Sequence, residues 1–354
     1  MRILLVPLSS EREACSRVRV HQYLPYLAAR GMTTRVEPFF PSVPDGYASP
    51  WPSLLGRLAD AQYVARRVIG LARIAASYDV VLLQRVLLPP WLLHVLRRRV
   101  RVLVFDFDDA IYTVHEGARP PHGDLTAHFT HTVRSSDAVI ASTPVLAARA
   151  SAIQSRVVTL PSPIDCHRYR PRASLPGPPR RPVAGWIGSA STTMYVERLM
   201  PLLKRLAGDS GGLCVEMVGA RLKDDSGGVR VHSWSLETEK ECLAGFDIGL
   251  MPLVDDEWAR GKAGYKLLQY MACGLPSVAS PVGANVQIVR QGETGFLAES
   301  LDEWEDCLRR LADDAALRER MGCRAREIVE QEYSLERWAP VFCDTIESCG
   351  RIEA

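Results

Sequence analysis

Lysine is scarce in this chain of 354 residues, because only five of its 43 basic residues are lysines and the others are arginines. Net charge is also small, since the formal charge at pH 7 is only +2. Binding along a nucleic-acid backbone needs a concentrated basic surface, which scattered arginines balanced by acids do not make. We therefore expect no nucleic-acid partner.

Long hydrophobic runs and paired cysteine motifs are missing as well. The apolar run after Arg2 is too short for a signal peptide or a spanning helix, and no other window holds ~18 uninterrupted apolar residues. The nine cysteines are odd in number and include no Cys-x-x-Cys pair, which favours neither a disulfide framework nor a zinc cluster. We predict reduced thiols and a cytoplasmic protein, which lies at the inner face of the membrane if its acceptor is a lipid.

Two series of alternating apolar strands and amphipathic helices fill the chain. The first runs from Arg2–Leu8 to Val157–Leu160, and the second begins at Val183–Ile187. Between them Pro171–Pro182 holds five prolines and almost no bulky apolar residue, which is typical of a linker. Such alternation predicts parallel sheets that bind ligands beyond the carboxyl ends of their strands. We expect an α/β protein with two Rossmann-like domains, residues 1–175 and 183–333. Helices are expected at 16–30, 54–77, 91–98, 195–206 and 266–272, and a strand at 100–105.

The segment from Gly261 to Ala298 is the most informative one. A glycine-bearing loop at 261–264 precedes the short helix expected at 266–272. Free N–H groups and the positive end of a helix dipole favour an anion there, and two of the five lysines, Lys262 and Lys266, add cations. The pattern predicts a bound diphosphate, although a glycine–lysine loop is also found at ordinary solvated helix starts.

Several motifs follow this loop or precede it. Gln269–Pro276 reads Gln-Tyr-Met-Ala-Cys-Gly-Leu-Pro, and Ser280–Gly283 and Gly292–Leu297 follow it. Further motifs lie at Ser16–Arg19, Asp106–Ala110, 161–169, Trp186–Ser189 and 330–338. Together they resemble family 4 glycosyltransferases, retaining enzymes of the GT-B fold whose donor signature contains a Glu/Gln-x-Met-Ala-x-Gly-x-Pro run. The resemblance implies two domains that face each other across a cleft and a C-terminal helix, 334–354, that packs back on the N-terminal domain.

The resemblance also implies how a nucleoside diphosphate sugar, UDP- or GDP-linked, would be held. The residues placed at its diphosphate are Gly188, Ser189, Lys262, Gly264 and Lys266. Gln269 is placed at its ribose. The family often has two glutamates eight residues apart here, where this chain has Gly261 and Gln269. An amide still bonds hydroxyls, so the sequence predicts that Gln269→Glu keeps donor affinity within about tenfold.

An acidic run at Asp106, Asp108 and Asp109 follows the strand expected at 100–105. Asp108 or Asp109 can orient or deprotonate an acceptor hydroxyl, and a carboxylate can also simply cap the following turn. An Asp-x-Asp pair is also the metal signature of the other large glycosyltransferase fold. A second domain with its own phosphate loop argues against that reading, so we predict no metal.

Other basic residues and one helix leave alternatives open. Arg17 either closes on the β-phosphate or is a solvated charge. The spacing of His115, His122, His128 and His131 selects none of them as an acceptor-side residue or metal ligand. The arginine-bearing helix at 54–77 either contacts an anionic membrane or, as its apolar spacing favours, faces the core.

The function predicted from these features is retaining transfer of a sugar from a nucleoside diphosphate donor to a hydroxyl acceptor, as in a hexosyltransferase. No cofactor is expected, and Lys262 and Lys266 would stabilise the departing diphosphate. The acceptor would be a small natural product, a polysaccharide or a lipid-linked saccharide. The alternatives are a nucleotide-sugar 2-epimerase of the same fold and a catalytically weak, nucleotide-sugar-binding partner subunit.

Overall fold

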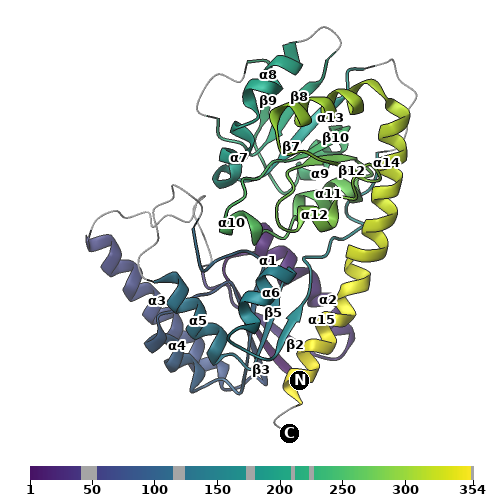
Figure 1. Cartoon of the computed structure of the whole chain (residues 1–354). Coiled ribbons are helices and arrows are strands. Elements are labelled where there is room, and N and C mark those ends of the chain that lie inside the picture. The colour runs from purple at the N-terminus through teal and green to yellow at the C-terminus, as the bar shows by residue number, and fades with distance from the viewer. Residues whose placement is uncertain (41–53, 115–123, 173–179, 209–211, 223–226, 352–354) are drawn as a thin grey trace. The chain divides into compact units, whose positions relative to one another are not determined.

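The computed structural model describes residues 1–40, 54–114, 124–172, 180–208, 212–222 and 227–351. The chain divides into two compact units. Unit 1 consists of Met1–Ser162, Asp256–Ala263 and Trp338–Ala354, and unit 2 consists of Pro163–Asp255 and Gly264–Arg337. Each unit contains a parallel sheet of six strands, and both sheets are visible in Figure 1.

The sheet of unit 1 has the strand order β2-β1-β3-β4-β5-β6. Its strands are β1 (Arg2–Pro7), β2 (Thr33–Val36), β3 (Val80–Gln84), β4 (Val102–Phe107), β5 (Ala138–Ala141) and β6 (Val157–Thr159). β1, β3, β4 and β5 are near-continuous apolar runs and are buried, as expected for parallel strands that are covered on both faces.

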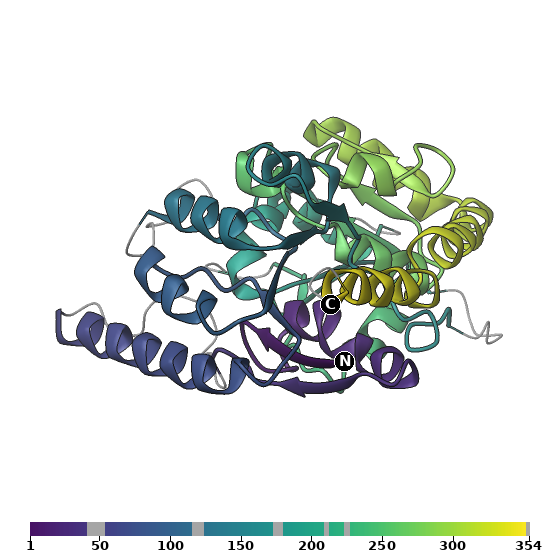
Figure 2. The same cartoon turned by 90° about the horizontal axis from the view of Figure 1, so that it is seen from below.

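Helices cover both faces of this sheet (Figures 1 and 2). The helices α3 (Leu54–Ala75), α4 (Pro90–Arg97) and α5 (Leu125–Ser135) lie on one face, and α2 (Leu24–Ala29) and α15 (Leu335–Gly350) lie on the other. α3 buries Val68 and Leu71 in the core of unit 1. On the second face Phe342 of α15 stacks on Tyr23, with ring centroids 4.0 Å apart. Within the described ranges, no helix is both long and apolar enough to span a membrane.

The sheet of unit 2 has the strand order β12-β11-β10-β7-β8-β9. Its strands are β7 (Val183–Ile187), β8 (Cys214–Val218), β9 (Arg230–His232), β10 (Ile248–Met251), β11 (Ser277–Ala279) and β12 (Gly295–Leu297). Its helices are α7 (Thr193–Glu197), α8 (Met200–Gly208), α9 (Glu239–Gly245), α11 (Tyr265–Ala272), α12 (Asn285–Ile288), α13 (Leu301–Asp313) and α14 (Ala315–Ile328). The short helices α1 (Ala14–Arg19), α6 (Pro144–Ser151) and α10 (Glu257–Arg260) belong to unit 1.

Three predicted elements differ from the structure. The single helix expected at 195–206 is divided into α7 and α8, because α7 ends at Glu197 and α8 begins at Met200. The helix expected at 16–30 is interrupted after α1, and α2 begins again at Leu24 with a proline in its first turn. Proline lacks the N–H that a continuous helix would need at this point, but it fits a helix start. β4 ends at Phe107 instead of residue 105, so Asp106 lies within the strand.

The boundaries of the units also differ from the expected ones. Residues 163–172 belong to unit 2 rather than to the N-terminal domain, because Ile164 pairs with Ser334 and Tyr169 bonds Glu239. The segment Asp256–Ala263 belongs to unit 1, although both strands that flank it are in unit 2. Residues 173–179 of the expected linker lie outside the described residues.

Candidate functional site

Two acids and an arginine meet at the carboxyl edge of the sheet in unit 1. Asp108 and Asp109 follow β4, and Arg85 follows β3, the neighbouring strand. Arg85 Nε bonds Asp108 Oδ1, and its Nη2 lies 2.5 Å from Asp109 Oδ2. Arg85 has a φ of +59°, the only positive value at a non-glycine residue in the described part of the chain. Such a conformation costs about 1–3 kcal/mol, which the double pairing offsets.

Lys262 joins this cluster from the segment 256–263. Its Nζ lies 3.7 Å from Asp109 Oδ1 and 5.0 Å from the centre of the Trp258 ring. Asp256 caps the preceding helix, α10, by accepting a hydrogen bond from the Ala259 N–H. The structure therefore brings together Asp108, Asp109 and Lys262, three residues that the sequence singled out, and adds Arg85, which it did not.

Asp106 has a different environment from its two acidic neighbours. Its side chain is fully buried, and it accepts hydrogen bonds from Arg19 Nε at 3.0 Å and Arg19 Nη2 at 2.6 Å. Asp106 thus pairs with Arg19 and Asp108 pairs with Arg85, and the two carboxylates do not face a common cation. In the described part of the chain, no group of three or more His, Cys, Asp or Glu side chains is arranged to hold a metal ion.

The other basic candidates of unit 1 lie elsewhere. Arg17 donates hydrogen bonds to the carbonyl oxygens of Glu11 and Arg12, in the loop that precedes its own helix. His128 and His131 lie on α5, where burial, and secondarily His131, lower the pKa of His128. His115 and His122 lie outside the described residues.

Lys266 lies at the carboxyl edge of the sheet in unit 2. Its Nζ is 4.7 Å from the centre of the Trp186 ring and 3.4 Å from Thr192 Oγ1. A Cβ atom at Gly188 would be 2.5 Å from the Trp186 ring and 2.9 Å from this Nζ, so the absence of a side chain there makes room for the ring and for the lysine above it. Ser189 follows, and its exposed hydroxyl bonds that of Ser191. Gly264, with φ +67°, is the N-cap residue of α11.

Gln269 lies on α11 and is only 5% exposed. Its Nε2 donates a hydrogen bond to Tyr169 Oη at 3.3 Å, and Tyr169 donates to Glu239 Oε1. Trp234 Nε1 donates to Glu239 Oε2 at 2.9 Å. Burial first, and then the neighbouring Glu239, raise the pKa of Tyr169 to about 12. The predicted ribose contact is therefore one end of a buried polar network. Tyr169 lies in the motif at 161–169, whereas the sequence did not suggest Glu239 or Trp234.

The predicted diphosphate loop lies where the chain passes from one unit to the other. Lys262 is in unit 1 and Gly264 and Lys266 are in unit 2. Each lysine has an aromatic ring in its own unit, Trp258 for Lys262 and Trp186 for Lys266. The loop thus supplies a cation to each of the two units.

Comparison with known proteins adds a family match to this geometry. Residues 183–314 match the family described as "Glycosyl transferases group 1". The chain also resembles N-acetyl-alpha-D-glucosaminyl L-malate synthase of Bacillus anthracis, with 37% identity over 76 residues, which are 21% of this chain and 20% of the relative. The match to this curated relative therefore spans about a fifth of its length.

Solved structures show the fold of the whole chain. Sucrose-phosphate synthase from Thermosynechococcus elongatus superposes with a TM-score of 0.77 at 17% identity over 98% of each chain. The Anabaena protein HepE, in complex with UDP-glucose, superposes with a TM-score of 0.70 at 15% identity over 98% of this chain and all of HepE. The chain shares the two-domain GT-B fold of these proteins, and the predicted fold class is confirmed.

The family match covers the candidate donor residues and leaves out the acidic cluster. Gly188, Ser189, Lys262, Gly264, Lys266 and Gln269 lie within 183–314. Arg17, Asp108 and Asp109 lie outside it. Their roles therefore depend on the geometry of unit 1 alone.

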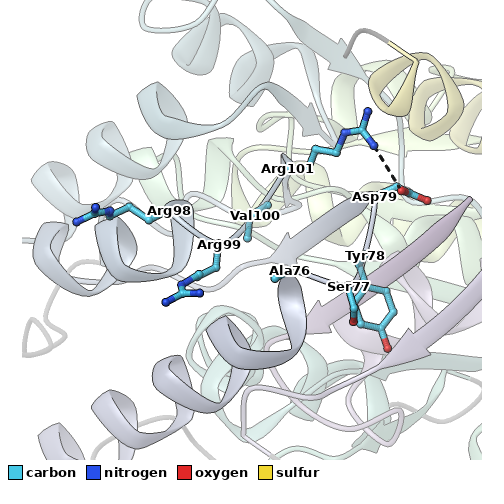
Figure 3. Close-up of a pocket in the computed structure, with 8 residues that line it drawn as sticks. All are labelled: Ala76, Ser77, Tyr78, Asp79, Arg98, Arg99, Val100 and Arg101. Carbon is cyan, nitrogen blue, oxygen red and sulfur yellow. Dashed lines mark ion pairs between the residues drawn. The ribbon is translucent and has the colours of Figure 1, made fainter. Parts of the chain in front are cut away.

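A hollow in the described structure lies at the opposite edge of the sheet in unit 1 (Figure 3). It has a volume of 530 Å³ and is lined by Ala76, Ser77, Tyr78, Asp79, Arg98, Arg99, Val100 and Arg101. Arg101 turns to Asp79, 3.8 Å away, whereas Arg98 and Arg99 point in other directions. These residues precede β3 and β4, so the hollow is separate from the site at the carboxyl ends of these strands.

Proposed function

We propose that this protein is a retaining glycosyltransferase that moves a sugar from a nucleoside diphosphate donor to a hydroxyl acceptor. The observation that carries the proposal is the coincidence of two findings in unit 2. The match to group 1 glycosyltransferases at 183–314 includes the carboxyl edge of the sheet where Lys266, Gly188 and Gln269 lie. Retention of configuration rests on the sequence resemblance alone.

The donor side of the proposed reaction is in unit 2. The positive end of the helix dipole at the start of α11 and the Lys266 ammonium group suit a diphosphate, because both favour negative charge. The structure of HepE with UDP-glucose supports a UDP-linked sugar as donor, and a GDP-linked sugar has the same diphosphate. Gln269 lies on the same helix, three positions after Lys266, and would bond the ribose.

The acceptor side is the cluster in unit 1. In the proposed step the bond between the anomeric carbon and the phosphate oxygen breaks while the acceptor oxygen bonds the anomeric carbon. The acceptor proton passes to the departing diphosphate, whose charge Lys262 and Lys266 stabilise. Asp109 lies beside Lys262, and its carboxylate can orient the acceptor hydroxyl by accepting a hydrogen bond from it.

One observation favours the second candidate, a nucleotide-sugar-binding subunit with little activity. A Cβ atom at Gly261 would lie 2.6 Å from Ala110 Cβ and 2.9 Å from the Ala110 nitrogen. The glutamate that the family often has at this position therefore does not fit in this chain. A slow donor hydrolysis by the purified protein would favour the enzyme, and binding without any turnover would favour the subunit.

The donor site is tested by its two lysines. We expect Lys266→Ala and Lys262→Ala each to weaken binding of UDP or GDP about tenfold to a hundredfold, because each removes a charge-assisted contact of ~1.5–3 kcal/mol. Isothermal titration calorimetry measures the change. Lys240→Ala, an exposed lysine of unit 2, is the matched control and should bind as the wild type does. Wild-type affinity in both site variants, with unchanged thermal unfolding, would exclude a diphosphate from this loop.

Chelation tests the proposal that lysines, not a divalent metal, neutralise the diphosphate. Donor hydrolysis or transfer is expected to persist in excess EDTA, because Asp106 and Asp108 are each paired with an arginine. Activity is measured before and after dialysis against the chelator. Complete loss that Mn²⁺ or Mg²⁺ restores would contradict the proposal and point to these two carboxylates as ligands.

A further inference from the structure

The buried network that ends at Gln269 connects three elements of unit 2. Glu239 begins α9, Tyr169 belongs to the segment that opens unit 2, and Gln269 lies in the middle of α11. Trp234 completes the network by donating to Glu239. Glu239, Gln269 and Tyr169 are each no more than 5% exposed, so their hydrogen bonds form away from water, where an unmade bond is costly.

The direction of each hydrogen bond in this network follows from its chemistry. An indole N–H can only donate, and a carboxylate can only accept, so Glu239 accepts from both Trp234 and Tyr169. A phenol has one proton, and Tyr169 gives it to Glu239. Tyr169 Oη can then only accept from Gln269, which must present its Nε2 rather than its Oε1.

The orientation of the Gln269 amide leaves its other end available. With Nε2 fixed on Tyr169, Oε1 takes no part in the network, and no described side chain or backbone group donates a hydrogen bond to it. An amide oxygen with free lone pairs on a side chain that is 5% exposed is suited to accept from a bound hydroxyl.

Arg326 of α14 holds the network in place. Its Nη1 donates to the Tyr169 carbonyl oxygen at 2.7 Å and to the carbonyl oxygen of Ala272, and its Nη2 donates to that of Cys166 at 2.9 Å. One guanidinium group thus fastens the segment that carries Tyr169 to the end of the helix that carries Gln269. The distance between the two side chains is therefore set by the backbone as well as by their own hydrogen bond.

We propose that Tyr169 and Glu239 are positioning residues that turn the carbonyl oxygen of Gln269 toward the donor ribose. The inference rests on the proposed function, since it assigns the ribose subsite of that donor site. The negative charge that the resemblance places at position 269 is present here at Glu239, two hydrogen bonds away. Gln269 acts on the ribose only as an acceptor, as a carboxylate would.

This arrangement reverses the expectation that glutamate is tolerated at position 269. In Gln269→Glu, two carboxylates face Tyr169, whose single proton serves only one of them, and a buried charge is left without a donor. We expect UDP or GDP affinity to fall by more than about thirtyfold, because Glu239 repels the new carboxylate, which then loses its bond to Tyr169 and its orientation toward the ribose. Gln287→Glu, which adds the same charge at an exposed position of unit 2, should bind as the wild type does.

The decisive variant carries both exchanges, Glu239→Gln and Gln269→Glu. All three hydrogen bonds are then kept. The two that involve Tyr169 reverse their direction, and the one from Trp234 does not. The new amide at position 239 would accept from Trp234 and donate to Tyr169, and Tyr169 would donate to the new carboxylate at position 269. We expect the double variant to bind within about fivefold of the wild type, a difference of ~1 kcal/mol. A merely structural role for these residues would make the second exchange add to the damage.

Calorimetry with UDP, with GDP in parallel, is run on the wild type, both single variants and the double variant. Wild-type affinity in Gln269→Glu, or a double variant that binds no better than Gln269→Glu, would overturn the inference. The matching 2′,3′-dideoxy nucleotide should bind the wild type more weakly and should lose this difference in Tyr169→Phe. If the wild type binds neither nucleotide, the proposed function fails, and with it the ribose contact. The unfolding midpoints of the same four proteins report on the network separately.

Discussion

Asp109→Asn is expected to lower turnover by about 10²–10⁴-fold while donor affinity stays within about tenfold. The variant keeps the size of the side chain but removes its charge. Asp109 lies beside Lys262 in unit 1, and its other oxygen bonds Arg85. An amide at this position presents N–H groups to at least one of these cations, so the contact that orients an acceptor hydroxyl is lost, while Lys262 keeps its charge for the diphosphate. Single-turnover rates and calorimetry separate the two effects.

Two further variants make this result interpretable. Asp108→Asn should also lower turnover more than donor affinity, since Asp108 shares Arg85 with Asp109. Asp79→Asn is the matched control, because Asp79 also pairs with an arginine but lies at the opposite edge of the same sheet. Unchanged turnover in both Asp108→Asn and Asp109→Asn, with donor hydrolysis present, would move the acceptor side to other residues.

Much of the fold can be predicted from the sequence because the central strands are buried on both faces. The runs in β1, β3 and β7 are almost wholly apolar, and apolar runs of this length between helical patterns have few other interpretations. The edge strands β9 and β12 have three residues each and are not distinguished by such a pattern. Their pairing with β8 and β11 depends on the neighbouring strands more than on their own residues.

The candidate site is predictable only where local sequence determines it. The loop before α11 contains two glycines and Lys262, and Lys266 follows in the first turn of the helix, so the segment can be found by inspection. Arg85 lies 23 positions before Asp108, and the two meet because β3 and β4 are neighbours in the sheet. Tyr169 and Glu239 are 70 positions apart and meet through the packing of unit 2. Contacts of this kind follow from strand order and helix packing, which no local spacing encodes.

Arg19 shows how a sequence motif can act on stability. It belongs to the Ser16–Arg19 motif, but it is fully buried and fixed on Asp106 by two hydrogen bonds. Its Nη1 also donates to the carbonyl oxygens of Leu160 and Pro161, at 2.9 and 3.0 Å, just before the chain leaves unit 1 at Ser162. Burial alone would lower the pKa of Arg19, but the adjacent Asp106 carboxylate raises it above its ordinary value, so the guanidinium group stays charged.

Arg19→Ala is therefore expected to lower the free energy of unfolding by about 3–5 kcal/mol, because it leaves Asp106 as an uncompensated buried charge. Urea denaturation followed by circular dichroism measures the loss. Arg19→Met combined with Asp106→Leu removes both charges and should lose less than Arg19→Ala alone, since no buried charge remains. Arg30→Ala breaks an exposed pair with Asp344 in the same unit and should cost little. A double variant only as stable as Arg19→Ala would place the energy in the contacts with Leu160 and Pro161, which both variants lose, rather than in the ion pair.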